Sequence, residues 1–131
     1  MEQLKTFFSG KSISKVLDIG TGSGDFIKLI RPVFDGNVQI TGIDPSEEAL
    51  AEARRAVDSP DVSFIRMEGE SLQFGDDSFD VVSLSNAMHH LADPAKTFAE
   101  MKRVVKPDGF LVIAEIVSDG LNEAQENQKM L

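Results

Sequence analysis

The segment 16–26 constrains this chain more than any other part of its sequence. Three apolar residues that suit a strand buried on both faces come first: Val16, Leu17 and Ile19. They lead into three glycines at alternate positions: Gly20, Gly22 and Gly24. Glycines allow left-handed backbone angles and a close approach of the main chain to a ligand. The segment therefore predicts a strand, a tight turn and a helix, with a ligand above the turn.

The glycine spacing separates two kinds of cofactor. A dinucleotide-binding turn has the pattern G-x-G-x-x-G, but here the third glycine, Gly24, comes one residue early. Asp18, two residues before the first glycine, would repel a pyrophosphate and attract the amino group or sulfonium of a cationic ligand. A tight turn without a ligand is the alternative. Such a turn would cost stability, because each glycine makes the unfolded chain more flexible and so lowers the folding stability by roughly 0.5–1 kcal/mol relative to alanine.

The pattern Asp-x-Gly-x-Gly-x-Gly resembles the first motif of class I S-adenosylmethionine-dependent methyltransferases. This resemblance implies cofactor contacts along the turn, from Asp18, Gly20, Thr21, Gly22 and Gly24. It extends from Val16 to Glu115 and implies S-adenosylmethionine as cofactor, with S-adenosylhomocysteine as product.

The order of apolar runs predicts the fold class. Five strand-like runs alternate with helix-like ones, at 15–19, 39–43, 62–67, 79–84 and 109–115. Together they predict a single α/β domain over 1–131 with a Rossmann-like, doubly wound parallel sheet. Right-handed crossovers give the strand order 3-2-1-4-5 and place a ligand crevice over the carboxyl ends of strands 1, 2 and 4.

Acidic residues follow the second and third predicted strands. Asp44 stands where two ribose hydroxyls could donate to it, with Pro45 beside it. An Asx turn or helix cap before Ser46 is the alternative. The resemblance implies that Glu68 accepts from the adenine amino group and that the backbone N–H of Gly69 faces a ring nitrogen.

The acidic stretch continues with Glu70, and it departs from the family pattern in two places. Glu68 replaces the usual aspartate, and Gln73 replaces the usual proline. A solvated acidic loop is therefore a serious alternative here.

The segment after the fourth predicted strand resembles the family's border between methionine moiety and substrate. Asn86 is placed to touch the cofactor, and His89 or His90 could take a proton from the acceptor. Packing or capping is the alternative for both histidines. No metal site is expected, because the i, i+4 ligand spacing is absent and the chain has no cysteine.

The composition of the chain indicates which classes of partner it binds and where in the cell it is located. Thirteen basic against twenty-two acidic residues give a net charge of −9, which opposes nucleic acid as a partner. The sequence has no signal-peptide pattern at its start and no run of ~20 apolar residues that could span a membrane. We expect a cytoplasmic protein that acts on a small-molecule substrate.

The two ends lead to further expectations. Residues 1–14 form a short N-terminal cap that either covers the pocket or packs against the sheet. The tail 118–131 is polar and helix-prone, so the family's last two strands are expected to be lacking. The open edge of strand 5 then predicts either a truncated chain or a homodimer that covers this edge.

These features together predict methyl transfer by in-line displacement, in which the protein mainly orients the two reactants. A cofactor-binding module or partner subunit without turnover is the first alternative. An NAD-dependent oxidoreductase is the second, and Gly24 and Asp18 both disfavour it.

Overall fold

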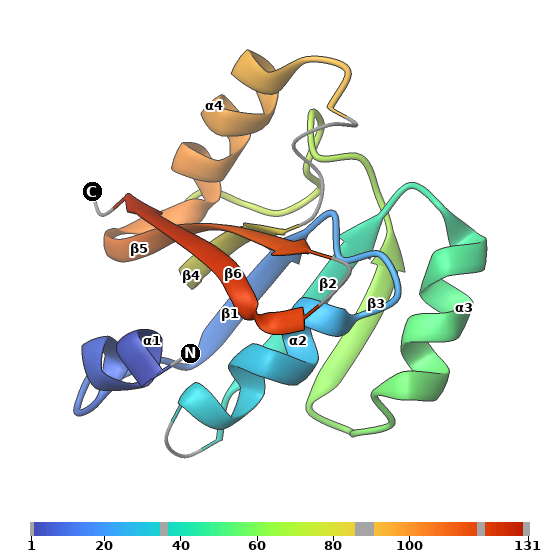
Figure 1. The fold of residues 1–131 in the computed structure, drawn as a ribbon. Coiled ribbons are helices and arrows are strands. Elements are labelled where there is room, and N and C mark those ends of the chain that lie inside the picture. Colours follow the sequence, from blue (N-terminus) through green and yellow to red (C-terminus); the bar gives the residue numbers. More distant parts are fainter. Residues whose placement is uncertain (1, 35–36, 86–90, 118–119, 130–131) are drawn as a thin grey trace.

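The computed structural model describes residues 2–34, 37–85, 91–117 and 120–129, with side chains up to residue 114 (Figure 1). In chain order the elements are α1 (Glu2–Phe8), β1 (Lys15–Ile19), α2 (Asp25–Ile30), a 3-10 turn (Arg31–Val33), β2 (Gln39–Asp44), α3 (Glu47–Ala56), β3 (Val62–Arg66), β4 (Phe79–Ser85), α4 (Pro94–Val104), β5 (Val105–Val117) and β6 (Gly120–Lys129).

The sheet has the order β3-β2-β1-β4-β5-β6. The first five strands are parallel, and β1 lies between β2 and β4. The predicted order 3-2-1-4-5 is therefore confirmed. Because the chain reverses direction across the sheet at β1, the carboxyl ends of β1, β2 and β4 meet at a topological switch point, where ligands bind in this kind of sheet.

Helices cover both faces of the sheet, as a doubly wound fold requires (Figure 1). On one face α1, α2 and α3 bury Leu4, Phe26, Ile27, Leu50 and Ala53 against the valines and isoleucines of the strands. On the other face α4 buries Met101 and Val104 against Leu17, Val82 and Leu84. The two cores use alternate residues of the same strands, because successive side chains of a strand point to opposite faces.

The expectation for the tail 118–131 is wrong. Instead of a helix, β6 pairs antiparallel with β5, from Val117↔Gly120 to Leu111↔Lys129. The sheet thus gains one strand beyond the predicted five, and the outer edge of β5 is not available for the homodimer that the sequence suggested. The physical reason is that the N–H and C=O groups along the edge of β5 can form hydrogen bonds with an adjacent segment. The stabilisation from these hydrogen bonds outweighs the small helix preference of Glu, Ala and Gln.

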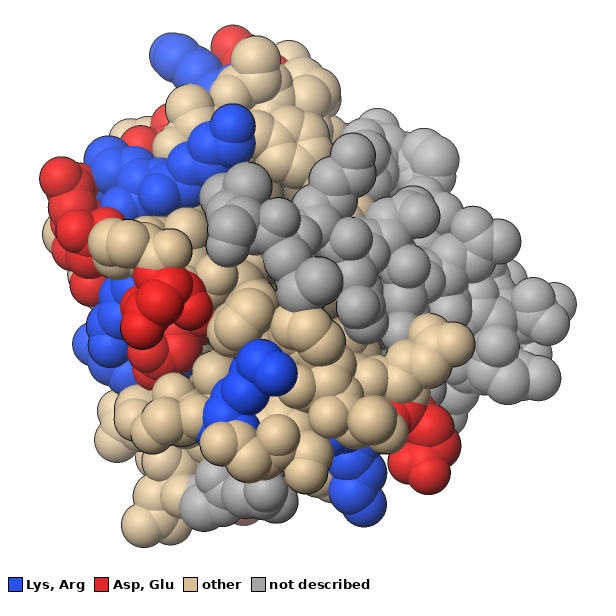
Figure 2. Space-filling model, turned by 90° about the vertical axis from the view of Figure 1, so that its left-hand side faces the viewer, with Lys and Arg blue, Asp and Glu red and all other residues tan. Residues whose placement is uncertain are grey.

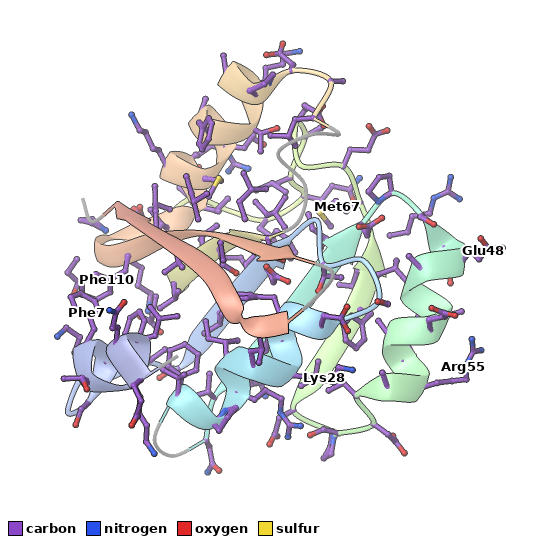
Figure 3. All side chains as sticks on the ribbon, viewed as in Figure 1. Phe7, Lys28, Glu48, Arg55, Met67 and Phe110 are labelled. Atoms are coloured by element: carbon purple, nitrogen blue, oxygen red, sulfur yellow. The ribbon has the colours of Figure 1, made fainter. Side chains whose placement is uncertain are left out.

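The N-terminal helix packs against the sheet. Leu4 and Phe8 are at most 2 % exposed. The rings of Phe7 and Phe110 meet edge to face with centroids 5.2 Å apart, and Figure 3 shows them side by side between α1 and β5. Of the two roles expected for residues 1–14, this contact supports packing.

No helix within the described ranges 2–34, 37–85, 91–117 and 120–129 is long and apolar enough to cross a bilayer.

Asp80 fastens the beginning of β1 to β4 and β5. Its Oδ2 accepts hydrogen bonds from the backbone N–H groups of Ser14 (2.8 Å) and Lys15 (3.0 Å), and its Oδ1 accepts from Lys106 Nζ (3.0 Å). Burial alone would raise the pKa of Asp80, but these donors outweigh it and hold the pKa below its usual value. The stabilisation is thus present above the ordinary pKa of the carboxyl and is lost as pH falls through the lowered one.

We expect Asp80→Asn to lower the free energy of unfolding at pH 7 by about 1–2 kcal/mol, because the amide cannot replace a charge-assisted acceptor. Urea titrations at pH 7 and pH 3 measure the difference, which should shrink at the lower pH. Asp58→Asn, at an exposed loop position, is the control. A deficit of equal size at both pH values would contradict this role.

Candidate cofactor-binding site

A cavity of about 300 Å³ opens at the carboxyl ends of β1 and β2. This volume lies within the range of small-molecule sites. Its wall includes seven residues that the sequence singled out: Gly20, Gly22, Asp44, Pro45, Glu68, Gly69 and Glu70. They come from three separate segments, so the fold brings together residues up to fifty positions apart.

Alternating left-handed backbone angles shape the glycine turn. Gly20, Gly22 and Gly24 have φ values of 72°, 55° and 88°. A Cβ placed on Gly22 would have no protein atom within 4 Å, so the bare backbone here faces open space in the cavity. The turn is held from below by the N–H of Thr21, which donates to the carbonyl of Ile43 at 2.9 Å. These features fit a ligand that lies directly on main chain.

Two predicted contact residues of the turn lie away from the cavity wall. Thr21 is 3 % exposed, and its hydroxyl lies under the turn against Gly42 of β2. Gly24 is buried against α3, where an added Cβ would lie 3.3 Å from that of Ala53. Both residues therefore shape the turn from inside the protein, and Gly24 allows α2 and α3 to approach closely.

Asp44 connects the tip of β2 with the glycine turn. Its Oδ2 accepts from the N–H of Gly22 at 3.0 Å, and its Oδ1 accepts from the N–H of Ser46 at 2.9 Å. The second bond is the Asx turn that the sequence left open as an alternative, and the helix cap is Ser46, whose Oγ accepts from Ala49 N–H. A carboxylate has about four acceptor sites, so Asp44 retains capacity for a ligand in the cavity it lines.

The loop after β3 forms the opposite wall. Gly69 packs against Ile19 and Thr97 so closely that a Cβ would lie 3.0 Å from Ile19 Cγ2. Its backbone therefore forms the wall directly, whereas Glu68 is exposed and Glu70 half-buried. Met67 begins this loop at the end of the sheet that holds the cavity (Figure 3), and its N–H donates to Asp44 O at 3.2 Å.

Sequence reasoning missed four apolar wall residues: Ile19, Met67, Leu91 and Ala92. Ile19 and Met67 were assigned to strands by their apolar character, and nothing local shows that their positions border a cavity. Leu91 and Ala92 belong to a segment that the resemblance placed beside the cofactor, but only the fold shows that these two residues line the cavity.

Asp18 lies beneath the turn and not on the cavity wall. It is fully buried, and the hydroxyls of Ser83 and Ser85 donate to it. Burial raises the pKa of Asp18 to about 7, although these hydroxyl donors lower it. Asn86, His89 and His90 lie outside the described residues.

Comparison with known proteins shows the family to which this chain belongs. The family described as "Methyltransferase domain" matches residues 17–113. Demethylmenaquinone methyltransferase of Renibacterium salmoninarum is 37 % identical over 101 residues, which are 77 % of this chain and 40 % of that protein. The chain spans half or less of the length of the curated relatives it matches.

Solved structures share the fold. A SAM-dependent methyltransferase from Aquifex aeolicus superposes with a TM-score of 0.74 at 25 % identity, covering 92 % of this chain and 68 % of the other. The cyclase SpnF has the same TM-score at 26 % identity, covering 92 % and 45 %. With most of the chain matched by the family, and with the glycine turn at the position where its first motif is expected, this protein is a member of the class I S-adenosylmethionine-dependent methyltransferases.

Proposed function

We propose that this chain binds S-adenosylmethionine in the cavity above β1 and β2 and transfers its methyl group to a small-molecule acceptor. The observation that carries the proposal is the bare backbone of Gly22, which faces open space beside the carboxylate of Asp44. A backbone cradle next to an acceptor for hydroxyl groups suits a nucleoside with a flexible charged side chain.

Different residues of the cavity wall would contact different parts of the cofactor. Gly20 and Gly22 would hold the methionine portion on main chain, and Asp44 with Pro45 would hold the ribose. Glu68, Gly69 and Glu70 would border the adenine edge. The apolar residues Met67 and Leu91 would exclude water from the adenosine.

When bound, S-adenosylmethionine supplies an activated methyl group that is displaced in line, with a neutral thioether as leaving group. Because the leaving group is already good, the chain's contribution is to orient the two reactants, which can supply roughly 7–11 kcal/mol of barrier reduction. A proton acceptor is required only where the acceptor atom carries a proton. His89 and His90 remain our candidates for this role.

The charges on the surface favour a small-molecule acceptor over a polyanion such as nucleic acid. Figure 2 shows basic and acidic side chains close together on the face that includes α1 and α4. Arg103 pairs with Asp76 and Glu100 at 2.8 Å each, and Lys106 pairs with Asp80 at 3.0 Å. Neighbouring acids thus compensate Arg103 at the end of α4 and Lys106 at the start of β5. The curated relatives named demethylmenaquinone methyltransferase also point to a small acceptor.

We expect Asp44→Ala to weaken S-adenosylhomocysteine binding by about 100-fold, because two hydrogen bonds to a carboxylate are lost at about 1.5 kcal/mol each. Isothermal titration calorimetry measures the change. Asp58→Ala removes an equal charge from an exposed loop and should bind like the wild type. Undiminished binding by Asp44→Ala would remove the ribose assignment.

A second candidate is a cofactor-binding module that does not transfer a methyl group. The similarity to SpnF favours it, because that neighbour is named a cyclase although it shares this fold. Turnover with a panel of small acceptors separates the two. S-adenosylhomocysteine formed only when an acceptor is present supports the transferase, whereas binding without turnover across the panel supports the module.

A further inference from the structure

A polar cluster interrupts the apolar face on which α1, α2 and α3 pack. Along β1, Val16 faces this core and Asp18 is the next residue on the same side. Along β4, Val81 is followed on that side by Ser83 and Ser85. The three polar residues are at most 1 % exposed. Polar groups at core positions cost stability compared with apolar ones, so the fold alone does not account for this cluster.

The cluster ties two strands together immediately below the cavity. Ser83 Oγ donates to Asp18 Oδ1 at 2.8 Å, and Ser85 Oγ donates to Oδ1 at 2.9 Å and to Oδ2 at 3.0 Å. Asp18 and Ser83 are register partners, and Ser85 is the last residue of β4. The next two residues of β1 and its turn, Ile19 and Gly20, line the cavity. The carboxylate therefore links Ser83 and Ser85 of β4 to the strand that leads into the glycine turn.

The surroundings of Asp18 make its charge state sensitive to pH. The groups that face it are the hydroxyls of Thr21, Ser83 and Ser85 and, as a repelling charge, the carboxylate of Asp44. From α2 the apolar side chains of Phe26 and Ile27 pack on this face. Burial is the largest influence and raises the pKa of Asp18 to about 7.

We propose that Asp18 is a positioning residue of the cofactor site: its ionised carboxylate accepts from Ser83 and Ser85 and so holds the end of β4 against the glycine turn. The inference rests on the proposed function. An ionised carboxylate accepts at both oxygens, whereas a carboxylic acid that carries its proton on Oδ2 keeps the two bonds to Oδ1 and loses the bond from Ser85 to Oδ2. Cofactor affinity should therefore fall as Asp18 takes up a proton.

Stability has the opposite pH dependence, which separates this role from a structural one. Because the pKa of folded Asp18 lies above its unfolded value, the folded state favours the neutral acid. The stability that neutral Asp18 contributes is therefore fully present below the ordinary value of 3.8 and is lost as pH rises from there to about 7.

The test measures S-adenosylhomocysteine affinity by calorimetry from pH 6 to 8.5 for the wild type, Asp18→Asn and Ser85→Ala. We expect wild-type affinity to rise about tenfold over this range and both variants to bind about tenfold more weakly at pH 8, which is a typical coupling between sites. Asp18→Asn should show a flat profile that meets the wild type near pH 6. Its stability toward urea at pH 8 should equal or exceed that of the wild type.

Two matched controls accompany the variants. Asp58→Asn and Ser63→Ala change the same residue types at exposed positions and should follow the wild-type pH profile. Asp18→Asn binding that equals the wild type at pH 8, or that is weaker by one constant factor at every pH, would overturn the proposal. If the wild type binds S-adenosylhomocysteine but the variants bind it like the wild type, the positioning role of Asp18 is refuted and the proposed function stands. No binding by the wild type at any pH would overturn both.

Discussion

Gly22→Val abolishes S-adenosylhomocysteine binding while the protein stays folded. The new side chain would project from a position with no protein atom within 4 Å, into the cavity that Gly22 lines. A β-branched residue at φ 55° is strained, so we also expect a stability loss of about 1–3 kcal/mol. We expect the affinity to fall by at least about 100-fold, as a branched side chain in ligand space leaves no room for the main-chain contact.

Gly10→Val is the matched control for this variant. Gly10 also has a left-handed backbone, with φ 79°, and a Cβ there would likewise meet no atom within 4 Å, but it lies between α1 and β1 and away from the cavity wall. It should lose a similar amount of stability and keep its affinity. Calorimetry and urea unfolding on both variants separate strain from blocked ligand space. Equal binding by the two would refute the assignment of Gly22 to the site.

The largest loss of stability is expected for Gly42→Ala. Gly42 lies in β2 under the glycine turn, and a Cβ there would lie 2.8 Å from Thr21 Oγ1, 2.9 Å from Ile27 Cδ1 and 3.0 Å from Phe64 Cδ1. Thr21, Ile27 and Phe64 are all buried, so none can move without displacing others. Overpacking of this kind costs about 3 kcal/mol.

Gly75→Ala is the control, since the nearest atom to its Cβ would be Ser78 Oγ at 3.8 Å and the residue lies in an exposed loop. Urea titration should show a midpoint that is clearly lower for Gly42→Ala and nearly unchanged for Gly75→Ala. A Gly42→Ala midpoint close to that of the wild type would show that the turn and β2 pack less tightly than the structure indicates.

Most of the fold could be predicted because its signals are local. Apolar runs of strand length alternate with helical periodicity, and this pattern leads to a parallel sheet whose order follows from right-handed crossovers. The predicted range 15–19 coincides with β1, and the other four ranges overlap β2 to β5. The tail was the exception. Its residues favour a helix weakly, and the partner that makes them a strand is Leu111–Val117, which a local pattern does not reveal.

Some residues of the candidate site could likewise be predicted from the sequence, and others could not. Gly20, Gly22 and Asp44 could be located from the sequence, because only particular residue types allow a left-handed turn or present a carboxylate at a strand end. Whether a side chain near that turn faces the cavity or the core depends on neighbours that are distant in the chain. Gly24 could be placed against α3, and Met67 on the cavity wall, only from the fold.

The amino-acid sequence by itself thus determined the five parallel strands, their order and the glycine turn, because strands and turn follow from local patterns and the order follows from right-handed crossovers. Only the tertiary structure decided the place of Asp18, which the register of β1 and β4 sets against Ser83 and Ser85 instead of in the cavity. The physical reason is that burial and hydrogen-bond partners belong to neighbours in space, and Asp18 and its serines are 65 and 67 positions apart in sequence.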